Sequence, residues 1–184
     1  QTCALPIFIR SFKQVAVDQS NENRRQFNML QLMNEVLLSL RPNLKKTQHQ
    51  VLIDCDPHLE IDSKPGPINQ ILINLIMNSL IHAFEHTDHG TISISVKVEQ
   101  NRCQIHYKDN GSGVPENIKK RIFDPFVTTK RGEGGSGLGM HLVYNLVTQA
   151  LNGKISLESA LGEGVDILFD FPVIVKASAA STIT

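Results

Sequence analysis

The sequence has no excess of charge of either sign and very little cysteine. Its 184 residues carry 18 Lys and Arg against 18 Asp and Glu, so the formal net charge is zero, and neither a nucleic-acid partner nor a polybasic membrane patch is expected. The three cysteines, Cys3, Cys55 and Cys103, are far apart and form no Cys-x-x-Cys pair. This spacing argues against a disulfide framework or a zinc site and favours a reducing compartment.

Long apolar runs are also absent. The longest stretch, Ile71–Met77, is interrupted by Asn74 and falls far short of the ~18 to 20 apolar residues that a bilayer-spanning helix needs. We therefore expect a soluble, cytoplasmic piece, which leaves open an inner-membrane anchor elsewhere in the parent protein. The 41% hydrophobic fraction, with 12 glycines, is ordinary for a globular chain and excludes disorder or collagen-like repeats.

The two ends differ in composition from the middle. Residues 1–7 are interpreted as a sequencing artefact, because one back-translation of Gln-Thr-Cys-Ala-Leu-Pro-Ile resembles the end of a common sequencing-library adapter. Residues 8–23 hold an amphipathic helical run and a polar linker. Residues 24–173 form the main domain, and residues 174–184 are predicted to be a disordered tail.

Helical and strand patterns alternate through the main domain, with no internal repeat. The expected strands are 24–28, 49–54, 59–62, 91–99, 103–108, 154–159 and 165–171, and the expected helices are 29–44, 64–84, 115–122 and 138–151. Pro42 should kink or shorten the first helix. The economical α+β arrangement is a sheet with helices on one face, in two layers around one core.

The predicted helix over residues 64–84 is apolar nearly all round, except along one line. Gln70, Asn74, Asn78 and His82 recur every four residues, which places them on one side of the helix. A buried amide without a partner costs ~1–3 kcal/mol, so two aligned Asn side chains need a ligand, water or a metal. The Asn carbonyl oxygen suits Mg²⁺ that bridges phosphates. The alternative is a line that faces solvent or bonds internally.

A second motif, Asp109-Asn110-Gly111-Ser112-Gly113, directly follows a predicted strand. Asp109 can accept a hydrogen bond, and the exocyclic amine of adenine is a suitable donor. Gly111 and Gly113 allow a close backbone approach to a flat ligand, or a positive φ. The alternative is a plain Asp-Asn-Gly turn.

A glycine-rich segment precedes the last predicted helix. Five glycines fall within residues 132–139 and run into a helix start whose free N–H groups attract phosphate. We interpret the segment as a mobile lid, with Phe123 and Phe126 as its apolar hinge and Lys130 and Arg131 able to reach a triphosphate. No Walker loop occurs, and a flexible linker is the alternative. His141, just beyond the glycines, is a further candidate neighbour of phosphate.

Four motifs together are more specific than any one. Asn74–Asn78, Asp109–Gly113, Phe123–Phe126 and Gly135–Gly139 follow one another in the order and spacing that resemble the N, first G, F and second G boxes of the sensor histidine kinase catalytic domain. The match spans roughly residues 24–172. It implies a Bergerat-type two-layer α/β sandwich, with a mixed, mostly antiparallel sheet, helices on one face and a flexible ATP lid.

The same resemblance implies roles for individual residues. Asn78 would be the Mg²⁺ ligand, Asp109 would read adenine, and Asn74 and Asn78 would be the catalytic residues. The remaining ATP-binding positions would be His82, Gly111, Gly113, Thr128, Thr129, Lys130, Gly135, Gly137, Leu138 and Gly139. The chain departs from the common pattern at Ile81, where a Lys is frequent, and at Val165, where a Thr is frequent.

The resemblance also implies an activity and partners. The domain would pass the γ-phosphoryl group of ATP to a histidine on an upstream dimerisation domain of a homodimeric parent, for relay to a response regulator. No His precedes His49, so this piece should hold the phosphate donor without the acceptor. Three alternatives stay open: an ATPase of the chaperone, gyrase or mismatch-repair type, an inactive nucleotide-binding module, and a serine kinase of the anti-sigma type.

Overall fold

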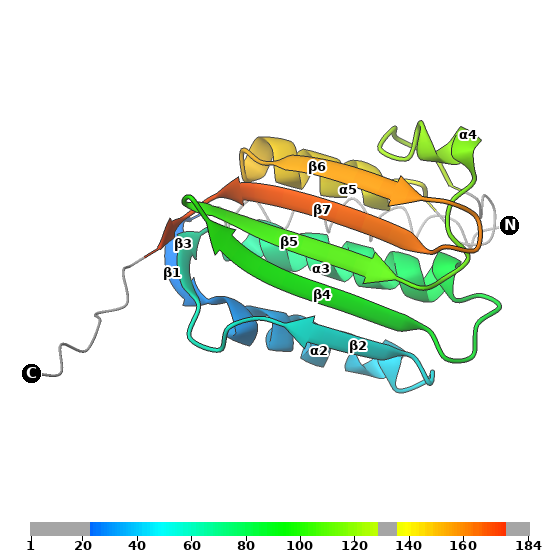
Figure 1. The fold of residues 1–184 in the computed structure, drawn as a ribbon, viewed down its shortest axis with the longest axis horizontal. Helices are drawn as coiled ribbons and strands as arrows, with labels where there is room; N and C mark the ends of the chain where they lie inside the picture. Colours follow the sequence, from blue (N-terminus) through cyan, green and yellow to red (C-terminus); the bar gives the residue numbers. More distant parts are fainter. Residues whose placement is uncertain (1–22, 129–135, 176–184) are drawn as a thin grey trace, which may run out of the picture.

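A five-stranded sheet forms one layer of the molecule. In the computed structural model, which describes residues 23–128 and 136–175, its spatial order is β2–β4–β5–β7–β6 (Figure 1). The strands are β2 (Gln50–Asp54), β4 (Thr91–Glu99), β5 (Arg102–Asp109), β7 (Val165–Pro172) and β6 (Lys154–Ser159). Only the β2–β4 pairing is parallel among these neighbours. This mixed, mostly antiparallel sheet confirms the expected α+β class.

A second, smaller sheet lies at one end of the first. It contains β1 (Arg25–Asn28), β3 (Glu60–Ser63) and β8 (Ile174–Val175), which pair in antiparallel fashion. The sequence patterns indicated β1 and β3 but not their pairing, and β8 was not expected. The sheet therefore extends two residues past the domain boundary predicted at residue 173.

Helices cover one face of the large sheet (Figure 1). They are α2 (Met29–Leu44), α3 (Pro65–Asn78) continued by the π-helical turn η2 (Ser79–Ala83), and α5 (Gly139–Asn145) continued by the π-helical turn η3 (Leu146–Ala150). A short helix, α4 (Glu116–Lys119), lies beside β6. The two π-helical turns fall where the sequence predicted continuous helices.

Local signals explain where the helices begin and end. The Asn28 side chain caps α2 by accepting a hydrogen bond from the Gln31 N–H at 2.8 Å, and Pro65 starts α3 at its first position. Pro42 does not shorten α2, which runs from Met29 to Leu44 as its sequence pattern predicted. Pro42 lies in the last turn, and Leu38, whose carbonyl loses its partner, lies on the exposed side of the helix.

The core lies between the inner face of the sheet and the helices. Alternate residues of three strands are buried there, among them Ile94 on β4, Ile105 on β5 and Phe169 on β7, as the period-two pattern predicted. They form one cluster with apolar residues of α3, including Ile71 and Leu75. This packing holds α3 and β5 side by side, and both contribute to the cavity described below.

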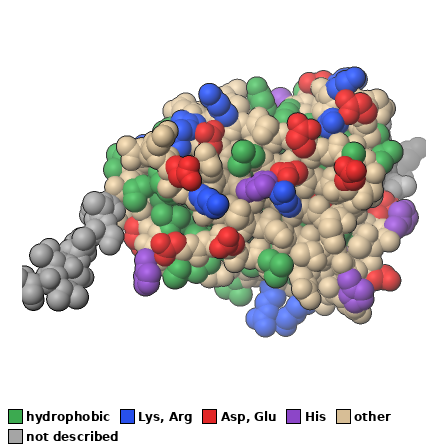
Figure 2. All heavy atoms as spheres, in the orientation of Figure 1, with side chains coloured by type: hydrophobic (Ala, Val, Ile, Leu, Met, Phe, Trp, Pro, Cys, Tyr) green, Lys and Arg blue, Asp and Glu red, His purple; other side chains and the backbone are tan. Residues whose placement is uncertain are grey.

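Acidic and basic side chains are interspersed over the outer face of the sheet, together with some apolar ones (Figure 2). Arg102 pairs with Asp170 at 2.6 Å, and His106 and Lys108 both contact Asp166. No helix within residues 23–128 and 136–175 has the length and apolar character needed to cross a membrane.

Candidate functional site

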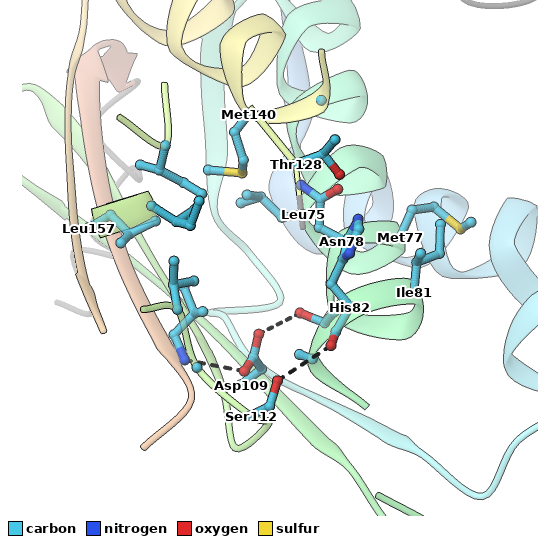
Figure 3. Close-up of a pocket in the computed structure, with 18 of the residues that line it drawn as sticks. Leu75, Met77, Asn78, Ile81, His82, Asp109, Ser112, Thr128, Met140 and Leu157 are labelled. Carbon is cyan, nitrogen blue, oxygen red and sulfur yellow. Dashed lines mark hydrogen bonds between the residues drawn. The ribbon is translucent and has the colours of Figure 1, made fainter. Parts of the chain in front are cut away.

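One cavity of about 500 Å³ opens at the edge of the helical layer. Its walls come from α3 and η2, from the loop after β5, from the start of α5, and from β6, β7 and their connecting loop. Figure 3 shows Asn78 and Asp109 at separate places on this wall. The cavity therefore brings together three of the motifs that the sequence singled out.

Asp109 ends β5 and is held at both carboxylate oxygens. Oδ1 accepts hydrogen bonds from the N–H groups of Gly111 at 3.0 Å and Val165 at 3.2 Å. Oδ2 accepts a 2.6 Å hydrogen bond from the Ser79 hydroxyl. The side chain is 8% exposed, so a buried anion with fixed orientation lines the cavity, and the alternative of a plain turn does not account for this arrangement.

Ser79 and Tyr107 extend this network into the interior. The Ser79 Oγ lies 2.7 Å from the Tyr107 hydroxyl, which also donates to the carbonyl of Leu75 at 3.0 Å. Burial raises the pKa of Tyr107 well above its ordinary value. Neither residue was predicted from the sequence to be part of the site. The signal that could have identified them is that each is a hydroxyl residue within an otherwise apolar pattern, of a helix for Ser79 and of a strand for Tyr107.

Asn74 and Asn78 reach the cavity from α3. The Asn74 amide donates to the carbonyl of Gln70 at 2.8 Å. This residue therefore does form a hydrogen bond within its own helix, as the alternative interpretation of the polar line expected. The Nδ2 of Asn78 is buried and has no hydrogen-bond partner within the described residues. His82, the next member of the predicted line, also lines the cavity.

Gly139 brings the start of α5 against these two amides. A Cβ atom placed on Gly139 would lie 3.2 Å from the Asn78 Oδ1 and 3.6 Å from the Asn74 Oδ1. This separation leaves little room for a side chain between α5 and α3. The beginning of α5, with its free N–H groups, therefore faces the part of the cavity that holds Asn78.

The side chains of the cavity fit a magnesium ion that takes few ligands from the protein. Within the described part of the chain, no group of three His, Cys, Asp or Glu residues could hold a metal by itself. The atom of Asn78 that could bind the ion is its Oδ1, which lies beside Gly139, whereas the buried Nδ2 without a partner is a donor that suits a phosphate oxygen. One amide oxygen fits an ion that takes one protein ligand and completes its shell with phosphates and water, which is typical of Mg²⁺ in nucleotide sites.

Two glycines shape the loop after β5, and they act differently. Gly113 has φ +69°, and a Cβ there would lie 1.9 Å from the carbonyl oxygen of Ala160. Gly113 lines the cavity, whereas Gly111 does not. Gly111 packs on η2, where a Cβ would lie 2.4 Å from the Ala83 side chain, and so lets the loop approach the helix end.

The far side of the cavity is formed by the residues that flank the predicted lid. Thr128, Gly137 and Gly139 line it, while Leu138 lies outside the lining and caps α5. The predicted contacts of Thr129, Lys130 and Gly135, and of Arg131, lie outside the described residues.

His141 is not among the residues that line the cavity. Its Nδ1 lies 2.9 Å from the carbonyl oxygen of Phe123, and its Nε2 lies 3.1 Å from the Asn145 amide nitrogen. The first contact joins the segment before the lid to α5, and the second lies within α5. The Phe123 and Tyr144 rings, 5.3 Å apart, strengthen the same attachment.

Two cysteines fall within the described residues, and neither acts in the cavity. Cys103 is buried in β5, and burial raises its pKa to about 12. Burial likewise raises the pKa of Cys55 to about 11. A raised pKa disfavours the thiolate, which is the reactive form of cysteine, and neither thiol lines the cavity.

The wall beside Asp109 is apolar. Val165 and Ile167 of β7, Leu157 of β6 and Ile118 and Ile122 of the α4 region line it. An apolar wall beside a buried carboxylate suits an aromatic base that carries an amine. The sequence indicated the carboxylate but not this wall, because its residues come from segments far apart in the chain.

Comparisons with known proteins agree with this geometry. The family described as histidine kinase-, DNA gyrase B-, and HSP90-like ATPase matches residues 63–174. Among curated relatives, the autoinducer 2 sensor kinase/phosphatase LuxQ of Vibrio vulnificus is 32% identical over 181 residues, covering 90% of this chain and 20% of that protein. Sporulation kinase A of Bacillus subtilis is 28% identical over 170 residues, covering 91% of this chain and 27% of that protein.

Solved structures show the same likeness. The catalytic domain of histidine kinase ThkA superposes with a TM-score of 0.70 at 27% identity, covering 82% of this chain and 95% of that one. Full-length ShkA in complex with AMPPNP superposes with a TM-score of 0.71, covering 85% of this chain and 32% of that one, and at 24% identity it shows the fold alone.

The chain belongs to the histidine kinase-, DNA gyrase B-, and HSP90-like ATPase family. The resemblance to sensor histidine kinase catalytic domains, and the Bergerat-type fold that it implied, are confirmed. The chain spans only 20% to 27% of the length of these curated relatives. What the whole protein does is therefore a matter for proposal.

Proposed function

We propose that this chain is the ATP-binding catalytic domain of a two-component sensor histidine kinase. It would bind Mg-ATP in the 500 Å³ cavity and transfer the γ-phosphoryl group to a histidine of an upstream dimerisation domain. The observation that carries the proposal is the shared cavity itself, which holds a fixed carboxylate, Asp109, in one part and an unfilled amide, Asn78, beside the start of α5 in another. These two features match the two ends of a nucleotide.

Asp109 would receive the exocyclic amine of adenine. Its carboxylate orientation is set by three donors from the protein, and a carboxylate has capacity for about four hydrogen bonds. The apolar wall that includes Leu157 and Ile167 would cover the face of the base. Val165, at a position where relatives often have Thr, contributes its backbone N–H to Asp109 instead of a hydroxyl to the base.

Asn78 would hold the magnesium ion, with His82 and the start of α5 near the phosphates. The ion would neutralise charge on the phosphate oxygens when bound. Gly139 brings the start of α5 close to both Asn amides, so backbone N–H groups of α5 can approach the phosphate chain. Thr128, and the predicted lid residues Thr129, Lys130 and Gly135, would contact the phosphates from the other side.

Asn74 argues for transfer to a protein and against rapid hydrolysis. The ATPases of this superfamily use a Glu at this position as general base. An amide cannot accept the proton of an attacking water, and the Asn74 amide is already engaged with Gln70. Catalysis would then come from positioning and charge stabilisation of an in-line transfer.

The partners follow from the same proposal. The phosphoacceptor would lie on a dimerisation domain of a homodimeric parent, and a response regulator would receive the phosphoryl group. The complex solved for histidine kinase ThkA with the response regulator TrrA supports this order of partners for a protein of the same fold. The parent protein would act in the cytoplasm, free or anchored in the inner membrane.

A transfer assay tests the proposal. The chain is mixed with γ-labelled ATP, magnesium and a separately produced dimerisation domain that carries an acceptor histidine. We expect label on that domain that survives base and is lost in acid. Asn78→Ala should abolish the transfer while its matched control, Asn43→Ala on the exposed end of α2, should not. ATP binding without transfer would instead indicate an inactive module, and acid-stable label would indicate a serine kinase.

A further inference from the structure

Two buried hydroxyls connect the site's carboxylate to the helix that carries the catalytic amides. Ser79 is 3% exposed and Tyr107 is 1% exposed, inside a core that is otherwise apolar. Ser79 immediately follows Asn78 and starts the π-helical turn, while Tyr107 and Asp109 are neighbours on the inner face of β5. The hydroxyl chain Tyr107–Ser79–Asp109 therefore joins two elements that each contribute to the cavity.

The number of available protons sets the direction of the hydrogen bonds in this hydroxyl network. Three short contacts link Leu75 O, Tyr107 OH, Ser79 Oγ and Asp109 Oδ2, but the two hydroxyls supply only two protons. The carboxylate and the carbonyl can only accept. The 2.6 Å contact to the charged carboxylate takes the Ser79 proton, so Ser79 Oγ can only accept in its 2.7 Å contact with Tyr107, whose single proton is shared between Ser79 Oγ and the Leu75 carbonyl. Each donor in such a chain polarises the next toward the anion.

We propose that Ser79 and Tyr107 are positioning residues that make the site selective for adenine by fixing the plane of the Asp109 carboxylate. The inference rests on the proposed nucleotide site. Two backbone N–H groups hold Oδ1, and Ser79 is the one side-chain donor given to Oδ2 in the described residues. Without that donor the carboxylate can rotate or admit water, and the distinction between a base that offers an amine and one that offers a carbonyl becomes weaker.

Isothermal calorimetry on the 184-residue chain with adenosine and inosine triphosphates tests the inference. Inosine carries a carbonyl where adenine carries the amine. Ser79→Ala should weaken adenosine triphosphate binding about tenfold and inosine triphosphate binding by less than about twofold, so the affinity ratio should fall about fivefold or more. Tyr107→Phe, which keeps the ring and removes the hydroxyl, should lower the ratio by about threefold.

Two matched control variants, and the ratio of the two nucleotide affinities, separate a loss of selectivity from a general effect on folding. Ser93→Ala on the outer side of β4 and Tyr144→Phe on α5, both exposed, should leave the ratio unchanged. Partial unfolding of a variant lowers the number of binding sites but does not change the ratio of two affinities. An unchanged ratio in Ser79→Ala overturns this inference alone. If the unaltered chain binds neither nucleotide, the proposed function fails and the inference fails with it.

Discussion

The two faces of strand β5 carry polar side chains of opposite character. On the inner face, Tyr107 and Asp109 are almost fully buried, and their polar atoms are engaged by Ser79 and by backbone groups. On the outer face, His106 and Lys108 are 37% and 52% exposed, and both contact Asp166. Consecutive residues of one strand thus experience very different surroundings, because side chains alternate between the faces.

The two faces differ in how much free energy a charged side chain costs there. An exposed ion pair contributes ~0–1 kcal/mol, since water screens it and solvates either partner alone. A buried carboxylate costs several kcal/mol unless donors compensate it. Inner-face Asp109 is compensated by three donors and lines the cavity, as its proposed role as the adenine contact requires. Four substitutions test this difference between the inner and outer faces of the sheet.

The largest effect is expected where a loop packs against the backbone of Asp109. Gly164 and Gly162 belong to the β6–β7 loop, with φ +73° and +80°, but a Cβ on Gly164 would lie 1.9 Å from the Asp109 carbonyl oxygen, whereas one on Gly162 meets nothing within 4 Å. Gly164→Ala should cost about 3 kcal/mol or more, and Gly162→Ala only the ~1 kcal/mol of φ strain. Urea unfolding of both variants measures the gap, and equal costs would contradict the packing described.

Asp109→Asn should have the next largest effect, on binding. The amide keeps the shape but loses the charge, and its NH₂ would face at least one of the three donors. Loss of a charged acceptor is worth ~1.5–3 kcal/mol, so ATP affinity should fall by ~10–100-fold. Calorimetry with ATP measures this. The same substitution on the outer face, Asp170→Asn, is the control and should leave the affinity unchanged.

The inner-face core was predictable because its pattern is local. Alternation of Ile92, Ile94 and Val96 indicated a half-buried strand, and these residues are buried on β4. Asp109 was identified because it ends a strand and precedes glycines, which is also a local signal. Asn74, Asn78 and His82 were placed on one line by helical spacing, and all three line the cavity.

Features that depend on long-range pairing were not predictable. Ser79 and Tyr107 are 28 residues apart, and each taken alone fits an apolar pattern with one hydroxyl. The pairing of β8 with β3 and the apolar wall that includes Ile118 and Leu157 likewise join distant segments. The π-helical turns were missed because a single extra residue in a helix leaves hydrophobic spacing almost unchanged.

Asp170→Asn should have a modest effect that depends on pH. The hydrogen bond from Arg102 lowers the pKa of Asp170 below its ordinary value. A lowered pKa in the folded state gives stability that is present above the ordinary value of about 4 and is lost as pH falls through the folded value. The substitution should therefore cost about 1 kcal/mol at pH 7, with the difference from the unaltered chain vanishing in acid. A cost that persists at pH 2 would assign it to packing.

Asp166→Asn, on the outer face of the sheet, should have the smallest effect. Burial acts to raise the pKa of Asp166, but hydrogen bonds from Lys108 and His106 outweigh it and lower the pKa overall. The three side chains are 37% to 52% exposed, so the cost should be about 0.5 kcal/mol and should shrink as salt is raised from about 0.05 to about 0.5 M, because the added ions screen the charges. Urea unfolding at several salt concentrations measures it. A cost as large as that of Gly164→Ala, or one insensitive to salt, would show that the outer face is as tightly constrained as the inner one, and the contrast between the two faces of β5 would be lost.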